Sequence, residues 1–289
     1  MMVRVSAPAK LNLTLDVLGV RADGYHEMKS VMQAVDLCDT VELTETAGGI
    51  TLAIMGSDLV PDERNTAYKA AAAFLQYIHR EEYGVHIDLH KHIPMQAGMA
   101  GGSADAAAVL VGMNALTGAG LSTETLCEIG AAVGADVPFC VAGGAAVASG
   151  IGTTLRAVAP LTDGWIVAAK PAVSVSTAEA YRAIDSAQGL PTPDHDGMCE
   201  AMAAGDLPRV GELLCNVFED ALALPAVTAL LDEMRVCAPL GCRMTGSGSV
   251  VFALFPSEEE ASRCAAMLQE KYTEVYICRP ITGGAEVLI

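Results

Sequence analysis

Apolar and polar residues alternate strictly near the start of the chain. The apolar positions are Leu11, Leu13, Leu15 and Val17. The polar positions between them are Lys10, Asn12, Thr14 and Asp16. A period of two places successive side chains on opposite faces of an extended strand. The pattern therefore predicts a strand whose polar face either meets water or lines a functional site.

Similar patterns predict helices and strands along the rest of the chain. Further strands are expected over residues 31–37, 40–44, 85–93, 165–169 and 274–278, with two short strands between 242 and 255. Helices are expected over residues 66–77, 103–116, 123–133 and 258–272, with shorter helical pieces between 176 and 235. The order lacks a regular βαβ rhythm, which favours the α+β class. The texture of the sequence changes around Pro160, so we expect two domains, at residues 1–158 and 159–289.

Composition narrows the class of protein. The chain has 289 residues, of which 52% are hydrophobic, enough for a packed core and too many for global disorder. Lys and Arg number 17 against 35 Asp and Glu, a net charge of -18. Nucleic-acid binders usually carry a basic field, so no nucleic-acid partner is expected. Any anionic ligand has to be captured by local groups.

The cysteines and the apolar stretches indicate a compartment. Nine cysteines occur without a C-x-x-C pair, which is typical of reduced, mostly buried thiols and fits the cytoplasm. The start of the chain lacks the apolar core of a signal peptide. The charge-free stretches 106–123 and 137–155 are interrupted by glycines and polar residues, so no membrane partner is expected.

A loop of small residues separates the strand at 85–93 from the helix that follows. It contains Pro94, Gln96, Ala97, Gly98, Met99, Ala100, Gly101, Gly102 and Ser103. Glycines let a backbone approach a ligand closely, and free N–H groups at a helix start attract anions. The loop lacks the Gly-Lys pair of a Walker A motif, and Ala100 breaks the dinucleotide pattern. Phosphate binding and a plain loop before a Ser-capped helix are both compatible with this segment.

Three other segments are weaker signals when each is taken alone. Lys10 and Asn12 suit either a ligand site or a solvated strand face. Asp136, two residues before Pro138, suits either a catalytic carboxylate or a helix cap. A run between the two strands of 242–255 suits either a tight turn or close approach to a phosphate, and contains Thr245, Gly246, Ser247 and Gly248.

A row of metal-ligand residue types lies along the strand at 85–93. Its members are His86, Asp88, His90 and His92. Same-face positions on one strand lie roughly 6.6–6.8 Å apart, too far for a tetrahedral site without help from another element. A face in contact with water is the simpler interpretation.

Taken in order, these segments resemble the GHMP kinases, a family of small-molecule kinases. The family's loop P-x-x-x-G-L-G-G-G-S-S-x-A-A reads here from Pro94 to Ala107, with Met99, Ala100 and Ala104 as departures. The resemblance implies an N-terminal ATP-binding domain like ribosomal protein S5 and a ferredoxin-like C-terminal domain. It also implies ATP with Mg²⁺, for which Ser103 is a candidate ligand.

The runs Ala7–Leu13 and Arg21–His26 resemble one branch of this family, whose members phosphorylate a cytidyl diphosphate sugar alcohol. The resemblance implies that Asp136 is the catalytic base, with Lys10 between it and the γ-phosphate. Asn12 is expected to hold the substrate. Asn65 lies in a segment associated with the adenosine pocket.

The same resemblance implies a cytosine site. His26 is expected to meet the base, with Tyr25 on one face of the ring and Tyr181 on the other. Thr177 is expected near the diphosphocytidyl group, beside the turn at 245–248.

Other functions stay open at this point. A homoserine or mevalonate type of kinase is the nearest alternative, and a non-catalytic nucleotide-binding sensor is the alternative from another class. The presence of both Lys10 and Asp136 favours catalysis. The expected assembly is a monomer or a homodimer.

Overall fold

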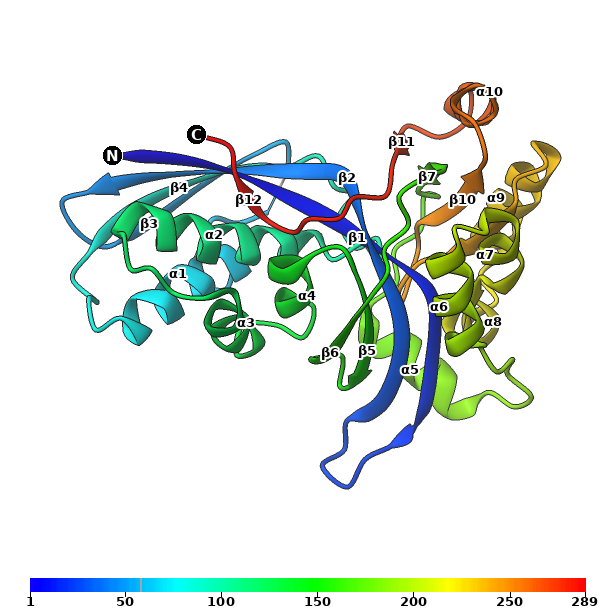
Figure 1. Ribbon diagram of the computed structural model, residues 1–289, viewed down its shortest axis with the longest axis horizontal. Helices are drawn as coiled ribbons and strands as arrows, with labels where there is room; N and C mark the ends of the chain where they lie inside the picture. Colours follow the sequence, from blue (N-terminus) through cyan, green and yellow to red (C-terminus); the bar gives the residue numbers. More distant parts are fainter. Residues whose placement is uncertain (58) are drawn as a thin grey trace.

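The computed structural model describes residues 1–57 and 59–289 and arranges them around two β-sheets (Figure 1). The larger sheet has the order β12-β1-β2-β4-β3, with β5 paired to β2 and β6, and β8 paired to β1. Its strands are β1 (Met2–Val20), β2 (His26–Thr46), β3 (Ile50–Met55), β4 (Gly84–His90), β5 (Ala145–Gly150), β6 (Thr154–Val158), β8 (Cys215–Asn216) and β12 (Glu286–Val287). The smaller sheet is antiparallel, in the order β11-β7-β10-β9. Its strands are β7 (Trp165–Ala169), β9 (Gly241–Met244), β10 (Val251–Phe255) and β11 (Val275–Cys278).

The helices gather beside the two sheets as two groups (Figure 1). The first group accompanies the larger sheet and consists of α1 (Thr66–Tyr77), α2 (Gly101–Thr117), α3 (Thr123–Ala131) and α4 (Val137–Ala142). The second group consists of α5 (Thr177–Ser186), α6 (His195–Ala204), α7 (Leu207–Leu213), α8 (Val217–Leu222), α9 (Pro225–Val236) and α10 (Glu258–Gln269). Mixed helices and sheets confirm the predicted α+β class.

Helix α2 lies close against the larger sheet because its sequence is made of small residues. A Cβ added at Gly112 would lie 2.3 Å from Leu43 Cδ1 of β2, closer than two carbon atoms can pack. The alanines Ala104, Ala106, Ala107 and Ala108 are fully buried in the same core. This close packing fixes the position of α2 against the larger sheet, and its N-terminus lines the cavity described below.

The polar face of β1 is buried from Lys10 to Thr14, so the prediction of a solvated face is wrong for these residues. Lys10 is 4% exposed, Asn12 is 2% exposed and Thr14 is fully buried. Segments from the second half of the chain cover these side chains, since Thr245 bonds to Asn12 and His195 to Thr14. Alternation in the sequence correctly predicted the strand but could not show what covers it.

Several elements match the predicted ranges, and others were missed. Helix α1 and strand β7 have the predicted bounds. Helix α2 begins at Gly101, two residues earlier than predicted, because Ala100 takes a left-handed backbone with φ of 60°. β2 is one continuous strand where two were predicted, and it is irregular opposite Pro8 and Ala9. The elements without a prediction are β3, α4, β5, β6, β8 and β12, each of which has only two to six residues.

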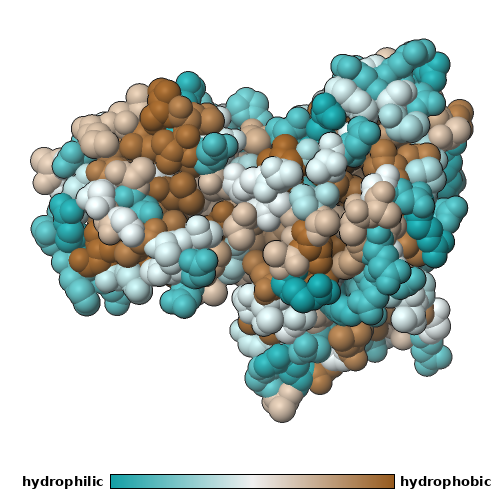
Figure 2. All heavy atoms as spheres, viewed as in Figure 1, coloured by the Kyte–Doolittle hydropathy of each residue, from teal (hydrophilic) through white to brown (hydrophobic). Residues whose placement is uncertain are grey.

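Two strands from the C-terminal half, β8 and β12, pair with β1 in the larger sheet. The change from the larger to the smaller sheet falls between β6 and β7, and the division at residue 158 stays a prediction. In the described ranges, no helix has both the length and the apolar run that a membrane crossing needs. Hydrophilic side chains cover α10, at the upper right of Figure 2.

Candidate active site

A cavity of about 840 Å³ collects residues from both halves of the chain. All but three of the site residues expected from the sequence line it. They are Lys10, Asn12, Asn65, Pro94, Gln96, Ala97, Gly98, Met99, Ala100, Gly101, Gly102, Ser103, Asp136, Thr177, Tyr181, Gly246, Ser247 and Gly248. Tyr25, His26 and Thr245 are not in this lining.

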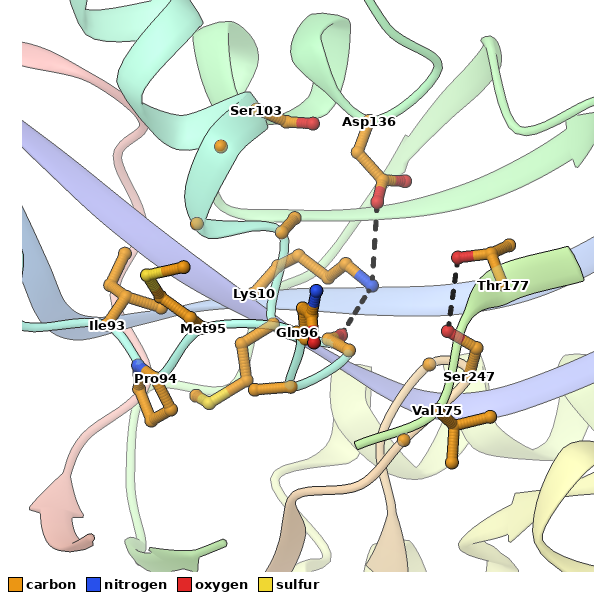
Figure 3. A pocket seen from close by; sticks show the side chains of 18 of the residues that line it. Lys10, Ile93, Pro94, Met95, Gln96, Ser103, Asp136, Val175, Thr177 and Ser247 are labelled. Carbon is orange, nitrogen blue, oxygen red and sulfur yellow. Dashed lines mark hydrogen bonds and ion pairs between the residues drawn. The ribbon is translucent and has the colours of Figure 1, made fainter. Parts of the chain in front are cut away.

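Lys10 is held at the cavity wall by three polar groups. Its Nζ donates to Asn12 Oδ1 at 2.7 Å and to the carbonyl oxygen of Gly98 at 3.0 Å. Nζ also lies 3.7 Å from Asp136 Oδ2, as Figure 3 shows. A buried ammonium needs such partners, because desolvation without them is costly. The result is a positive charge fixed beside the backbone of the loop that precedes α2.

Asp136 is the residue before α4, where the sequence was compatible with a helix cap. Its side chain makes no capping hydrogen bond. Instead the carboxylate faces Lys10, and 35% of the side chain is exposed to the cavity and solvent. A carboxylate beside an ammonium and accessible from the cavity suits proton abstraction.

The loop from Gly98 to Ser103 enters α2 through a left-handed turn. The N–H groups of Ser103 and Ala104 both bond to the carbonyl of Ala100, at 2.9 Å each. Within the part of the chain described, the N–H groups of Gly101 and Gly102 have no acceptor. Free N–H groups at the positive end of a helix dipole form an anion site. Ala100, a departure from the family pattern, tolerates the left-handed backbone here.

The loop also joins the two halves of the molecule. A Cβ added at Gly98 would lie 2.0 Å from the carbonyl oxygen of Thr245, so the two backbones touch. Asn216 secures the other side, since its Nδ2 donates to the carbonyl oxygens of Met244 and Gly246 at 2.7 and 2.9 Å. Thr245 Oγ1 accepts the N–H of Asn12 at 3.0 Å. Thr245 therefore lies behind the lining and supports it.

A buried charge cluster beneath the loop was not predicted from the sequence. Lys91 Nζ bonds to Asp39 and lies 2.6 Å from Asp105 Oδ2, with all three side chains almost fully buried. Burial raises the pKa of Asp105 from 3.8 to about 7, because the Lys91 ammonium only partly offsets desolvation and the Asp39 charge. Lys91 and Asp105 both line the cavity. The available signal was that Asp105 is the one charged residue in the apolar sequence of α2.

Of the aromatic residues expected around a cytosine, only Tyr181 lines the cavity. The rings of His26 and Tyr181 stack with centroids 4.4 Å apart. Phe218 packs edge-on against Tyr181 at 5.1 Å, and His26 Nε2 lies 2.8 Å from Asp185 Oδ1. Tyr25 is 63% exposed at the tip of the β1–β2 hairpin. The ring of His26 therefore covers a face of Tyr181.

Two remaining candidates take local roles at the cavity rim. Asn65 caps α1, with its Oδ1 accepting the N–H of Ala67 at 2.8 Å. Thr177 Oγ1 lies 3.4 Å from Ser247 Oγ, which joins the start of α5 to the glycine-rich turn (Figure 3).

Oxygen atoms are the available metal ligands in the cavity. The described residues contain no group of three or more His, Cys, Asp or Glu side chains suited to a metal. His86 of the histidine row instead bonds to Thr51 and Asp88, as a strand face in contact with water does. Ser103 and Asp136 offer a hydroxyl and a carboxylate from the same side of the cavity (Figure 3). Such donors suit Mg²⁺, which prefers oxygen and keeps most of its ligands as phosphates and waters.

Comparisons with known proteins agree with this geometry. Residues 65–144 match the GHMP kinases N terminal domain, and residues 198–274 match the GHMP kinases C terminal family. The chain belongs to the GHMP kinases.

Related GHMP kinases cover nearly the whole chain. The 4-diphosphocytidyl-2-C-methyl-D-erythritol kinase of Carboxydothermus hydrogenoformans is 42% identical, over 98% of this chain and 99% of the relative. The protein of the same name from Exiguobacterium sibiricum is 44% identical over 96% and 98%. A crystal structure of 4-(cytidine 5'-diphospho)-2C-methyl-D-erythritol kinase superposes with a TM-score of 0.78 at 32% identity, covering 98% of this chain and 97% of that one. Homoserine kinase from Cytophaga hutchinsonii also gives 0.78, at 21% identity, which shows the shared GHMP kinase fold.

Proposed function

We propose that this GHMP kinase transfers the γ-phosphoryl group of ATP to the 2-hydroxyl of 4-diphosphocytidyl-2-C-methyl-D-erythritol, a step in non-mevalonate isoprenoid precursor biosynthesis. The observation that carries the proposal is the Lys10–Asp136 pair, 3.7 Å apart, in one cavity with the N-terminus of α2. Relatives of that name, at 36–44% identity over nearly the full chain, support the substrate.

Asp136 acts as the base in this proposal. An alcohol is a weak nucleophile at neutral pH, and a carboxylate within hydrogen-bond reach of its proton assists the attack. The carboxylate is accessible from the cavity, so the hydroxyl can reach it. The hydroxyl oxygen then bonds to the γ-phosphorus as the bond to the ADP oxygen breaks, and Asp136 keeps the proton.

Lys10 stabilises the charge of the phosphoryl group in transfer. Catalysis of this step consists mainly of positioning and of fixed charge near the phosphoryl oxygens. The ammonium is already held by Asn12 and Gly98, so little reorganisation is needed when ATP binds. Bound Mg²⁺ would neutralise part of the phosphate charge, and Ser103 and Asp136 are the residues placed to hold it.

The two substrates bind at different parts of the cavity, ATP at the loop before α2 and the cytidyl substrate at Tyr181. ATP phosphates bind the free N–H groups of Gly101 and Gly102, with the adenosine toward Asn65. The cytosine binds near Tyr181, with Tyr25 closing from the hairpin, and Thr177 and Ser247 near the diphosphate. Because His26 now stacks on Tyr181, base stacking on that face requires the His26 ring to move.

The compartment and the assembly complete the proposal. We place the enzyme in the cytoplasm, where nine free cysteines stay reduced. A monomer or homodimer stays the predicted assembly.

A substrate panel tests the proposed function. Purified protein is assayed for ATP consumption and phosphorylated product with 4-diphosphocytidyl-2-C-methyl-D-erythritol, homoserine and mevalonate in parallel. We expect turnover with the cytidyl substrate and none with the other two. Rapid phosphorylation of homoserine or mevalonate would assign a different GHMP kinase activity, and ATP binding without any turnover would indicate a sensor.

A further inference from the structure

A buried histidine from the second half of the chain contacts β1 at Thr14, four residues along the strand from Lys10. His195, the first residue of α6, is 6% exposed. Its Nδ1 lies 2.8 Å from Thr14 Oγ1. Its Nε2 is buried and has no hydrogen-bond partner among the described residues. A buried polar atom without a partner is uncommon and needs an explanation beyond packing.

Donor and acceptor chemistry fixes the direction of a hydrogen-bond chain that begins at Lys10. The ammonium can only donate, so Asn12 must present its Oδ1 at 2.7 Å. Asn12 Nδ2 then donates to Ser30 Oγ, also at 2.7 Å. Ser30 Oγ passes its own hydrogen to the carbonyl oxygen of Thr14 at 2.6 Å. The orientation of the Asn12 amide is therefore tied to Thr14.

Thr14 stands at an irregularity of β1 that its hydroxyl helps to hold. Asn12 pairs with Met32 and Thr14 with Val31, so Leu13 is an extra residue between them. Thr14 Oγ1 accepts the N–H of Val31 at 3.1 Å, and its single hydrogen is then available for His195 Nδ1. Bulges beside active sites often set the aim of a side chain. The imidazole of His195 is therefore the second hydrogen-bond partner of the Thr14 hydroxyl at this bulge.

We propose that His195 is a positioning residue for phosphoryl transfer, which holds Thr14 and, through Ser30 and Asn12, the Lys10 ammonium facing Asp136. The inference rests on the proposed function, in which Lys10 and Asp136 carry the reaction. Burial, with Lys29 nearby, lowers the pKa of His195, which favours the neutral imidazole. In the tautomer that is protonated at Nε2, Nδ1 accepts the hydrogen of Thr14 Oγ1. His195 acts through Thr14 and contacts neither proposed substrate subsite.

Steady-state kinetics of three variants test the chain. His195→Phe removes the acceptor, Thr14→Val removes the hydroxyl, and Thr14→Ser keeps it. We expect His195→Phe and Thr14→Val each to lower kcat about tenfold, with less than about a twofold change in KM for either substrate. Thr14→Ser should restore most of kcat. The kcat of the double variant His195→Phe/Thr14→Val should be no lower than that of the less active single variant, because both substitutions break the same chain.

A matched control and a readout without turnover separate positioning from folding. His86→Phe, on the outer face of β4 away from the cavity, should leave kcat unchanged. The side-chain amide resonances of Asn12, recorded by NMR on the unliganded protein, should shift in His195→Phe and Thr14→Val but not in Thr14→Ser. The NMR measurement does not depend on which substrate is phosphorylated. It therefore tests the role of His195 separately from the proposed function. A lowered melting temperature with unchanged kcat and Asn12 resonances, or additive losses in the double variant, would overturn the proposal.

Discussion

At the residue scale, the Lys10 ammonium is oriented before any substrate binds. Asn12 and Gly98 accept its hydrogen bonds, and Asp136 lies 3.7 Å from Nζ. The Lys10 bonds to Asn12 and Gly98 do not depend on the Asp136 carboxylate. A change at Asp136 therefore tests chemistry without dismantling the site.

Asp136→Asn should lower kcat by about 10²–10⁴-fold, because the amide cannot take the hydroxyl proton. The melting temperature should stay at the wild-type value, since the side chain caps no helix and is partly exposed. Calorimetry with ATP in the absence of Mg²⁺ is the control and should show no loss of affinity. Substantial turnover by the variant would remove Asp136 from the base role.

Tyr25 and Tyr181 should matter to the cytidyl substrate and not to ATP. Stacking on a base is worth about 1–3 kcal/mol, so Tyr25→Ala and Tyr181→Ala should raise KM for that substrate about 10- to 100-fold. Tyr25→Phe and Tyr181→Phe keep the ring and serve as matched controls, with nearly wild-type KM. Equal losses for ATP and the cytidyl substrate would contradict the assignment.

Asp105 should make stability depend on pH in a specific direction. Its pKa is about 7 in the folded protein against 3.8 ordinarily, because it is buried beside Asp39. Between about pH 4 and pH 7 the folded state therefore holds a proton that the unfolded chain has lost, and this stabilisation disappears as pH rises.

In Asp105→Asn, the free energy of unfolding should fall less between about pH 5 and about pH 8 than in the wild type. Urea unfolding at both pH values measures the difference. Asp232→Asn, exposed on α9 and paired with Arg235, is the matched control and should keep the wild-type difference. Identical pH dependence in Asp105→Asn and the wild type would show that Asp105 does not hold the proton.

At the scale of elements, the site depends on a contact between two loops from different halves of the chain. The loop before α2 touches the turn between β9 and β10 at Gly98 and Thr245. Gly98 also has a φ of 74°, in the left-handed region where a side chain is strained. The loop can keep its position only if residue 98 has no side chain.

Gly98→Ala should cost about 3 kcal/mol or more, since backbone strain adds to overpacking against Thr245. KM for ATP should rise at the same time. Gly118→Ala, at the other end of α2, has a similar φ of 64° and no atom within 4 Å of the new Cβ. That control should cost only about 1 kcal/mol, from strain alone. Equal costs in urea unfolding would mean that the contact with Thr245 contributes nothing.

At the scale of the whole molecule, the acidic surface works against capture of the proposed substrates. The chain carries a net charge of -18, and both ATP and a cytidyl diphosphate are anions. Hydrophilic side chains cover α10, whose first turn is Glu258, Glu259 and Glu260 (Figure 2). Attraction therefore has to come from Lys10 and the N-terminus of α2, at short range.

Raising the ionic strength should increase kcat/KM for the cytidyl substrate at low substrate concentration. Between about 10 mM and about 150 mM salt the Debye length falls from about 30 Å to about 8 Å, which screens the surface repulsion. Charge-neutral crowding agents at matched viscosity provide the control. A steep fall of kcat/KM with salt would indicate that the field of the protein attracts the substrate.

The sequence alone determined which segments carry the proposed chemistry. The loop from Gly98 to Ser103, Lys10 and Asp136 were predicted as site residues through the resemblance of their order to the GHMP kinases, since each segment alone also suits a structural role. Local patterns also predicted α1 and β7 correctly, since the period of apolar residues reflects one element at a time. Short elements such as α4 and β5 carry too little periodicity to be seen.

Only the tertiary structure decided how these segments meet. Lys10, Gly98, Asp136 and Gly246 are far apart in the chain and line one cavity because β1, α2, α4 and the β9–β10 turn pack together. Whether the polar face of β1 is wet or buried depends on Thr245 and His195, which reach it from the other half of the molecule. The Lys91–Asp39–Asp105 cluster arises in the same way. Burial and long-range pairing are properties of the packed chain, so no local pattern can specify them.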